Sequence, residues 1–538
     1  MRRARLAGTA EILAKRLRSA ASRLGTAVAR RERLWLGLCL TAVGLVLLSF
    51  LAIHAALSRG LVPRWINTDP EEFLLSYESA SSWIPGVIRV HGLTLRGSDP
   101  SIQWFARMED ATIQISLADL LFRRFHATRV RARGLTFRLR EREQAREISP
   151  PHAARLPDIP GFANPPRQTG QPAPVPTGAE KGRFWAVLVE DLIADPTPEI
   201  WIEIYRFRGH ARVAGSFLIH PHARAWVGPA TVQLLQGDIT LAPDQPLLSR
   251  CSGSISTVIS PYDPERVRGD DVWPLIDGNA RLEGRLSDLR FFNHFLRRTT
   301  EPRLEGGEGT ATIALRFVRG IGTGHVDFEE PQLKASYGQA SLRGRAAGRF
   351  EIRRWDQQHG DLDFSGSRIA LTEVATAGDA HPSRDWWGRF DFDRARLRDG
   401  LDARPRVTCR DARPLYTLLR AQLPDWAEGI LRLDGLEASA RVRLAHDLVE
   451  VQELEANGGK FHLAGRYRER GDVRQGAFLV ERGALAVGVE IAGGASRVRL
   501  FGARSWFAHA AGDRSPPASA SASEAGLRRG GAASDAIR

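Results

Sequence analysis

Apolar and polar residues follow two different patterns along the chain. Residues 34–57 are apolar or small except for His54, with no Asp, Glu, Lys or Arg among them. Beyond residue 86, single apolar and polar residues alternate in one stretch after another, as in 111–117, 310–317 and 485–491. A long apolar run predicts a helix, and alternation with a period of two predicts β-strands that have one face in water.

The apolar run is long enough to cross a membrane. As a helix it would extend about 36 Å, against roughly 30 Å for the hydrocarbon core. A cleaved signal peptide is the competing interpretation, but its apolar region is shorter and ends in a small-residue cleavage site, whereas this run is followed by Ser-Arg-Gly at 58–60. We therefore expect a retained transmembrane helix, anchored by residues such as Leu34, Leu45 and Leu57.

Charge sets the expected orientation of this helix. Residues 1–33 contain ten Arg or Lys and two Glu, which gives +8 of the formal net charge of +14. The positive-inside rule then predicts a single pass through a bacterial inner membrane, with the N-terminus in the cytoplasm and the bulk of the chain in the periplasm. Because so much of the basic charge lies beside the membrane, the pI near 10.5 does not indicate nucleic-acid binding, and we expect none.

The three cysteines give little further information. Cys39 lies in the apolar run, and Cys251 and Cys409 would lie in an oxidising periplasm. Whether the last two form a disulfide depends on geometry, so the sequence leaves that pairing open. Their spacing does not match a metal site.

Proline interrupts the alternating pattern once. Residues 142–182 contain nine prolines. Proline fixes the backbone and has no N–H group to donate a hydrogen bond, so this segment is unsuited to strands or helices and is predicted to be a solvated insertion. The tail is rich in Ala, Ser and Gly and is expected to be disordered. The chain therefore divides into a cytoplasmic basic tail (1–33), a transmembrane helix (34–57), an N-terminal β-groove segment (61–141), the Pro-rich insertion (142–182), the main β-groove (183–507) and a disordered tail (508–538).

The alternating stretches predict a mostly β fold, in which an extended, curled antiparallel sheet with a few short helices follows the transmembrane helix. The strands outnumber those of one small closed barrel, and the helices are too few to cover the apolar side of the sheet. Such a groove would run roughly 100 Å at about 4.8 Å per strand and would hold an apolar guest such as an acyl lipid. The expected groove-lining residues are Ile113, Ile115, Leu117, Ile313, Leu315, Phe317, Val442, Leu444, Leu463, Val487 and Val489.

Several segments also resemble a known family. The order of a basic tail, one apolar span, and the stretches 87–95, 111–121 and 135–139 is similar to the N-terminal part of AsmA-like proteins, and 448–466 with 498–501 is similar to their C-terminal region. The resemblance, to AsmA/TamB-type repeating β-groove proteins of the Gram-negative envelope, implies phospholipid transport to the outer membrane and outer-membrane homeostasis. It implies phospholipid, the inner membrane and an outer-membrane or periplasmic protein at the far end as partners. This chain differs from the larger members in its short length and its Pro-rich insertion.

Enzymatic chemistry is the weaker hypothesis. The sequence contains no Gly-x-Ser-x-Gly elbow, Walker A loop or His-Glu-x-x-His helix. A metal could be bound by carboxylate pairs such as Asp361 with Asp363, or by the histidines at 220 and 222. Residues two positions apart share one face of a strand, however, so a solvent-facing strand already explains the carboxylate pairs. We expect no catalytic residue, metal or cofactor. The alternative to a lipid carrier is an assembly factor for outer-membrane proteins that acts by strand addition at a sheet edge.

Overall fold

The computed structural model describes the greater part of the chain. The described residues are 40–41, 44, 48, 50–67, 70, 73–98, 102–142, 156–162, 164–166, 185–220, 223–241, 245–264, 266–267, 269–294, 303–337, 340–377, 385–411, 435–445, 447–471, 473–493 and 495–512. The predicted basic tail, Leu34, Leu45 and most of the Pro-rich insertion lie outside them. The described part is mostly β-structure with a few short helices, which confirms that part of the predicted fold.

The helices are short and the strands are long. The helical elements are α2 (Leu61–Ile66), α3 (Leu117–Leu120), α8 (Ala503–Gly512) and two 3-10 turns, η1 (Gly269–Leu275) and η2 (Leu289–His294). The strands of the first half are β1 (Phe73–Ser76), β2 (Ser79–Ile84), β3 (Val87–Ser98), β4 (Ile102–Ile115), β5 (Arg124–Arg133), β6 (Thr136–Glu141), β7 (Ala186–Ile202), β8 (Tyr205–His220), β9 (Arg224–Leu241), β10 (Gln245–Tyr262) and β11 (Ile276–Leu286). Those of the second half are β12 (Arg303–Gly306), β13 (Gly309–Val318), β14 (Ile321–Tyr337), β15 (Ala340–Asp356), β16 (Asp361–Asp363), β17 (Arg368–Ala377), β18 (Trp386–Leu397), β19 (Leu401–Cys409), β20 (Leu436–Leu444), β21 (Leu448–Gly458), β22 (Phe461–Arg470), β23 (Val473–Arg482), β24 (Leu485–Ala492) and β25 (Ala495–Arg499).

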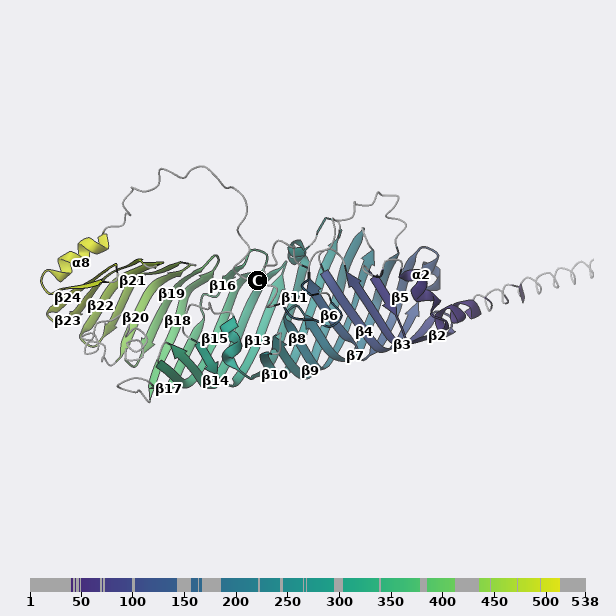
Figure 1. Cartoon of the computed structure of the whole chain (residues 1–538), viewed down its shortest axis with the longest axis horizontal. Coiled ribbons are helices and arrows are strands. Elements are labelled where there is room, and N and C mark those ends of the chain that lie inside the picture. The colour runs from purple at the N-terminus through teal and green to yellow at the C-terminus, as the bar shows by residue number, and fades with distance from the viewer. Residues whose placement is uncertain are drawn as a thin grey trace, which may run out of the picture.

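All 25 of these strands belong to one sheet. Strands pair with near neighbours in the sequence, so the sheet grows along the molecule in chain order from β1 and β2 to β25 (Figure 1). Four pairs lie end to end in a shared row, namely β1 with β2, β5 with β6, β12 with β13 and β16 with β17. At about 4.8 Å between rows, the ribbon extends roughly 100 Å before twist shortens it.

One step of the ribbon departs from the predicted antiparallel order. Strand β7 runs parallel to β5 and β6, with Arg124 opposite Ala186 and Leu139 opposite Ile202. Parallel neighbours need a crossover connection of a dozen or more residues, and the Pro-rich insertion is that connection. Gly134, at a φ of 65°, separates β5 from β6 within their shared row. The insertion is therefore a structural requirement of the sheet at this point.

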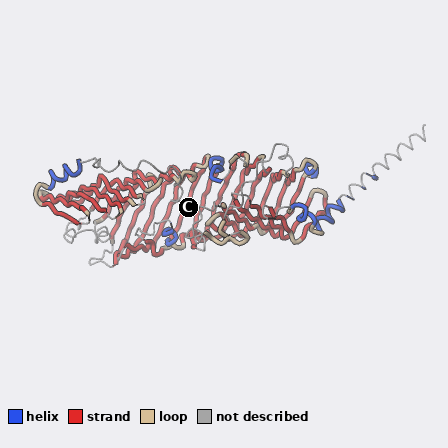
Figure 2. Tube along the Cα trace, turned by 45° about the horizontal axis from the view of Figure 1, so that its top comes forward, coloured by secondary structure: helices blue, strands red, loops and turns tan. Residues whose placement is uncertain are grey.

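β-Bulges bend the long strands near their middles. The register shifts between Ser249 and Ser252 in β10, between Glu330 and Leu333 in β14, and in the same way in β17, β18 and β21. Each bulge bends its strand and increases the twist, so a series of them curls the ribbon about its long axis. Figure 2 shows the strands stacked along the length, with the helices of the described part at the rims and ends.

The N-terminal helical residues dock on the first strands. Residues 50–58 are helical, and Leu57 at their end is buried against the sheet. Tyr77 Oη donates to the carbonyl oxygen of Leu57 (2.8 Å), and the Ser82 amide donates to His54 Nδ1 (3.3 Å). Leu57, predicted as a membrane anchor, is thus packed into the protein core. Within the described residues, no helix is both long and apolar enough to cross a membrane.

The C-terminal boundary also differs from the prediction. Helix α8 continues to Gly512, past residue 508 where the sequence analysis placed the start of a disordered tail. The helix is held by Trp506, which lies over Gly488 of β24, and by an ion pair between Arg504 and Glu481 (2.5 Å). An aromatic contact and a charge pair to the sheet, which the Ala-rich composition does not indicate, extend the folded part.

Candidate functional site

The sheet has one continuous apolar face, which we call the inner face. It consists of four hydrophobic clusters, numbered here along the ribbon. Each is named by two of its buried members: Val90 and Met108 in the first, Ala127 and Val189 in the second, Ala211 and Cys251 in the third, and Val374 and Leu436 in the fourth. Ile113 belongs to both the first and the second cluster, and Leu342 and Leu371 belong to both of the last two. Val213 of the first cluster pairs with Val232 of the third. Apolar side chains therefore follow one another from β2 to β22, and the pairs Leu463–Val480 and Val480–Val487 continue the row into β24.

Burial on the inner face changes with distance from the bulges. Residues beside the bulges, such as Ala211, Cys251 and Val374, are completely buried. Residues farther along the strands, such as Ile313 and Leu315, remain partly exposed. A trough gives this gradient, because side chains crowd together on its floor while those on its walls have no opposing layer. The inner face is thus the floor and walls of a curled sheet.

Ten of the eleven predicted lining residues lie on the inner face. Strand pairing places them in one row with cluster members, for example Ile313 opposite Leu282, and Leu463 opposite Ala456. Most are partly exposed, whereas Val489 is buried. Leu117 is the exception: β4 ends at Ile115, and Leu117 begins helix α3 at the rim of the sheet. The predicted strand runs to Leu117, two residues beyond the end of β4.

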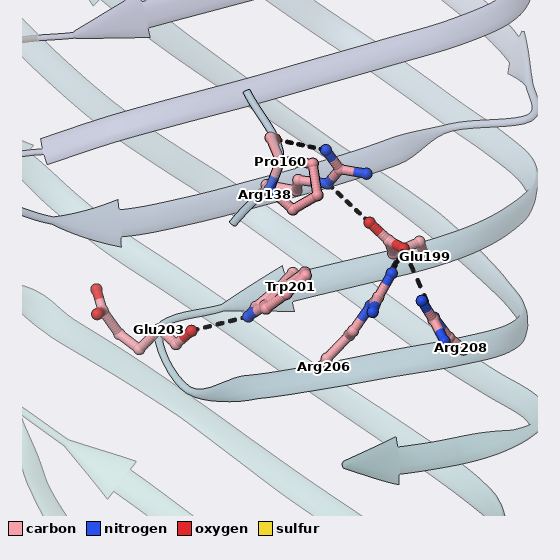
Figure 3. Close-up of polar contacts among 7 residues, drawn as sticks. All are labelled: Arg138, Pro160, Glu199, Trp201, Glu203, Arg206 and Arg208. Carbon is pink, nitrogen blue, oxygen red and sulfur yellow. Dashed lines mark hydrogen bonds and ion pairs between the residues drawn. The ribbon is translucent and has the colours of Figure 1, made fainter. Parts of the chain in front are cut away.

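The opposite, outer face is polar and rich in ion pairs. Glu199 of β7 accepts hydrogen bonds from Arg138 Nε (2.7 Å) and Arg206 Nη2 (2.6 Å), and Arg208 Nε lies 3.8 Å from it (Figure 3). Burial opposes ionisation of Glu199, but the two arginine hydrogen bonds outweigh it and lower the pKa of this carboxyl. The guanidinium of Arg206 also stacks over the Trp201 ring at 4.4 Å. This part of the outer face is stabilised by its own ion pairs.

The crossover packs on the outer face. Arg138 Nη1 donates to the carbonyl oxygen of Pro160 (2.6 Å; Figure 3), and Arg140 Nη1 donates to that of Pro157 (2.9 Å). Ile159 is completely buried, and the Arg140 guanidinium lies 5.6 Å from the Phe162 ring. The insertion was predicted to be solvated, but its described part is packed against the sheet. Alternation places Arg138 and Arg140 on the polar side of the sheet, where they donate to the carbonyl groups of the insertion. The described residues of the insertion therefore do not pack on the inner face.

Helix α8 lies on the same side of the sheet as the crossover. Its Trp506 contacts Gly488, which alternates with the inner-facing Val487 and Val489. The guanidinium of Arg499 lies 5.3 Å from the Trp506 ring. The crossover and α8 thus pack on the outer face, whereas Leu57 and Val62 of the N-terminal helical residues pack on the first cluster of the inner face.

The inner face contains a buried acid and two thiols. Glu330 lies beside the β14 bulge, opposite Ala346 of the inner face, and Oε1 accepts from the Gln332 amide (3.2 Å). Burial raises its pKa. Cys251 and Cys409 are free and buried, and burial raises the pKa of each thiol to about 11. The pairing that the sequence left open is thus absent.

The carboxylates weighed as metal ligands have other partners. Asp363 accepts from Ser365 Oγ (2.6 Å) and Arg396 Nε (2.9 Å), and Asp361 lies 3.9 Å from Arg354. Throughout the described ranges, no group of three or more His, Cys, Asp or Glu side chains could hold a metal ion. These carboxylates form ion pairs with arginines on neighbouring strands.

No family model matches this chain, and neither a characterised protein nor a solved structure is significantly similar to it. The resemblance to AsmA-like proteins therefore stays a prediction from the sequence. What the fold and the inner face define is a class: an elongated, curled β-sheet with apolar clusters along one face.

Proposed function

We propose that this protein is an inner-membrane-anchored periplasmic carrier that holds the acyl chains of phospholipids in its trough and takes part in their movement between the inner and outer membranes. The observation that carries the proposal is the continuous, partly exposed apolar inner face, together with the packing of the crossover and α8 on the outer face. Exposed contiguous apolar surface of this extent costs solubility unless a guest or partner covers it.

The chemistry of the two faces supports a lipid guest in particular. Aliphatic and aromatic side chains line the trough, and an acyl chain is long, flexible and apolar throughout, so it matches such a surface without needing specific polar contacts. A phospholipid headgroup would remain in water above the rims. The trough needs no catalytic group for this role.

Photocrosslinking within the full-length protein tests the proposal. A benzoylphenylalanine at Ile313 faces the trough, and one at Thr323, an exposed outer-face position on the neighbouring strand, is the matched control. After irradiation in cells, mass spectrometry should find phospholipid adducts at 313 and none at 323. Equal adduct formation at both positions, or none at either, would contradict a lipid-filled trough.

Leu315→Glu supplies a second test. A bound acyl chain would have to desolvate the new carboxylate at a cost of several kcal/mol. Since about 1.4 kcal/mol is a tenfold change, the phospholipid that co-purifies with the protein should fall at least tenfold. Thr323→Glu adds the same charge on the outer face and should leave lipid content unchanged.

A second candidate function has one specific observation in its favour. Strand β25 pairs only with β24 among the described strands, and all five of its residues are exposed. A free edge of this kind can accept a strand from another protein, as the assembly-factor hypothesis requires. Protein adducts at Val498, together with an inner face that carries no lipid, would favour this function over the carrier.

A further inference from the structure

Large apolar side chains gather at the edge of the sheet next to the N-terminal helical residues. We call this group the proximal edge: Trp83 and Ile84 before the β2–β3 turn, Leu117, Leu121 and Phe122 in and after α3, and Trp185 before β7. The exposed fractions of Trp83, Leu121 and Phe122 are 72%, 84% and 79%. Apolar side chains this exposed, gathered in one place, indicate a binding surface.

Backbone contacts bring these segments together. The Ile115 amide donates to the carbonyl oxygen of Gly86 (2.7 Å), which joins the end of β4 to the β2–β3 turn. The Ala186 amide donates to the carbonyl oxygen of Arg123 (3.1 Å), which joins the start of β7 to the turn after α3. Three strand ends that are distant in sequence therefore share one edge.

The same edge contacts the helical residues that the sequence assigns to the end of the membrane span. The His54 and Trp83 rings are 4.2 Å apart, and the Ser82 amide donates to His54. In Figure 1, β2 and α2 lie at the same end of the ribbon, where the chain leaves the sheet towards its N-terminus. A helix that spans a bilayer would hold this edge close to the bilayer surface.

Charge on the proximal edge suits a phospholipid surface. Arg123 and Arg124 are exposed between the apolar positions, and Arg59 follows the helical residues. The acid in α3, Asp119, is bound to His126 Nδ1 (2.7 Å), and Arg124 lies 3.8 Å from it. Tryptophan, phenylalanine and arginine together are typical of the interface between headgroups and acyl chains.

We propose that the proximal edge is a second membrane contact, which rests in the headgroup region of the bilayer and sets the mouth of the trough at the level of the lipids. The proposal relies on the proposed function in that the apolar run at 34–57 must span the same bilayer. The two contacts together fix the tilt of the ribbon, because one helix alone allows rotation about its junction. Phospholipids then reach the inner face from the leaflet past α3 and the start of β7.

A fluorescent label on the full-length chain tests this contact. In a Cys39→Ser background, the buried Cys251 and Cys409 stay unlabelled, and Phe122→Cys carries an environment-sensitive fluorophore. The protein is reconstituted into vesicles of phosphatidylethanolamine and phosphatidylglycerol, with or without lipids that bear a doxyl quencher near the headgroup. Thr128→Cys, on the solvent side of the neighbouring strand, and Leu485→Cys, exposed at the far end, are the controls.

Quenching at position 122 should be severalfold stronger than at 128 or 485. Replacing both Leu121 and Phe122 by Asp should abolish quenching of a label at Ile84→Cys, and both replaced side chains are too exposed for the fold to depend on them. Equal quenching at all three positions would overturn the contact, as would a label at 122 that is shielded from water only when another protein is present.

The failure of this inference is distinguishable from the failure of the proposed function. Lipid adducts at Ile313 without quenching at 122 would overturn the membrane contact and leave the carrier function supported. Quenching at 122 without adducts at 313 would support the contact and contradict lipid carriage. Extraction of the protein by alkaline carbonate would show that the span itself is wrong, and both would be lost.

Discussion

The difference between floor and wall of the trough predicts unequal costs for two similar truncations. Val374 lies on the floor beside the β17 bulge and is completely buried, whereas Leu315 lies on a wall and is partly exposed. Val374→Ala removes two methyl groups, worth about 1.6 kcal/mol in transfer free energy, and leaves a closed cavity, so its total cost is about 2–3 kcal/mol. Leu315→Ala leaves no closed cavity and should cost only about 1 kcal/mol.

Amide hydrogen exchange is the suitable assay, because it gives the free energy of opening of each strand separately. A long sheet in which each strand contacts its neighbours opens in parts, so a single unfolding transition would average over them. In lipid-free protein, exchange should report the larger loss in β17 for Val374→Ala and the smaller loss in β13 for Leu315→Ala. With phosphatidylglycerol bound, the cost of Leu315→Ala should rise by about 1 kcal/mol, because the guest buries the remaining surface.

The outcome that would refute this reasoning is specific. If Leu315→Ala costs lipid-free protein about 3 kcal/mol or more, as a fully buried leucine does, and lipid leaves that value unchanged, the wall is already covered by the protein itself. The trough would then be sealed, and the carrier function would lose its main support.

Three further predictions concern buried titratable groups. Burial raises the pKa of Glu330, so the neutral carboxyl is the form that the folded protein favours. Its stabilising contribution is complete below the unfolded pKa of about 4.3 and is lost as the pH rises through the raised value. Thermal unfolding at neutral pH should therefore show that the Glu330→Gln variant is more stable than the wild-type protein. The lowered pKa of Glu199 has the opposite sign: Glu199→Gln should be less stable by about 1–3 kcal/mol at neutral pH, with the difference vanishing as pH falls through the lowered value. At pH 8, Cys251 and Cys409 should resist maleimide until the protein is denatured, since burial raises both pKa values to about 11; rapid modification of the native protein would contradict this.

Much of the fold could be predicted because strand alternation is a local property. Ile313 and Leu315 were assigned to the apolar side from their immediate neighbours, and pairing with β11 and β14 left that assignment intact. The end of the strand was predicted wrongly, since Leu117 continues the alternation in sequence but starts α3 in the structure. A period-two pattern does not indicate where the hydrogen-bonded ladder stops.

The curl of the sheet was predicted, but the positions of the bulges that produce it leave almost no signal in the sequence. Three of the bulges place Arg250, Glu373 and Glu453 at φ values near 50°, a conformation that glycine would have indicated and these residues do not. The parallel pairing of β7 with β5 and β6 could not be predicted for a different reason. A Pro-rich segment appears solvated from composition, while the groups that hold it, Arg138 and Arg140, belong to another part of the chain. The composition of the segment itself gives no sign of these long-range contacts.

Because strands pair with their near neighbours in the sequence, the length of the sheet is set by the number of hairpins. Each additional hairpin lengthens the trough by about 10 Å without altering the contacts of strands farther away, and each hairpin removed shortens it by the same amount. The length of the sheet is therefore adjustable in steps by duplication or deletion of short segments, with the first strands and the β25 edge unchanged.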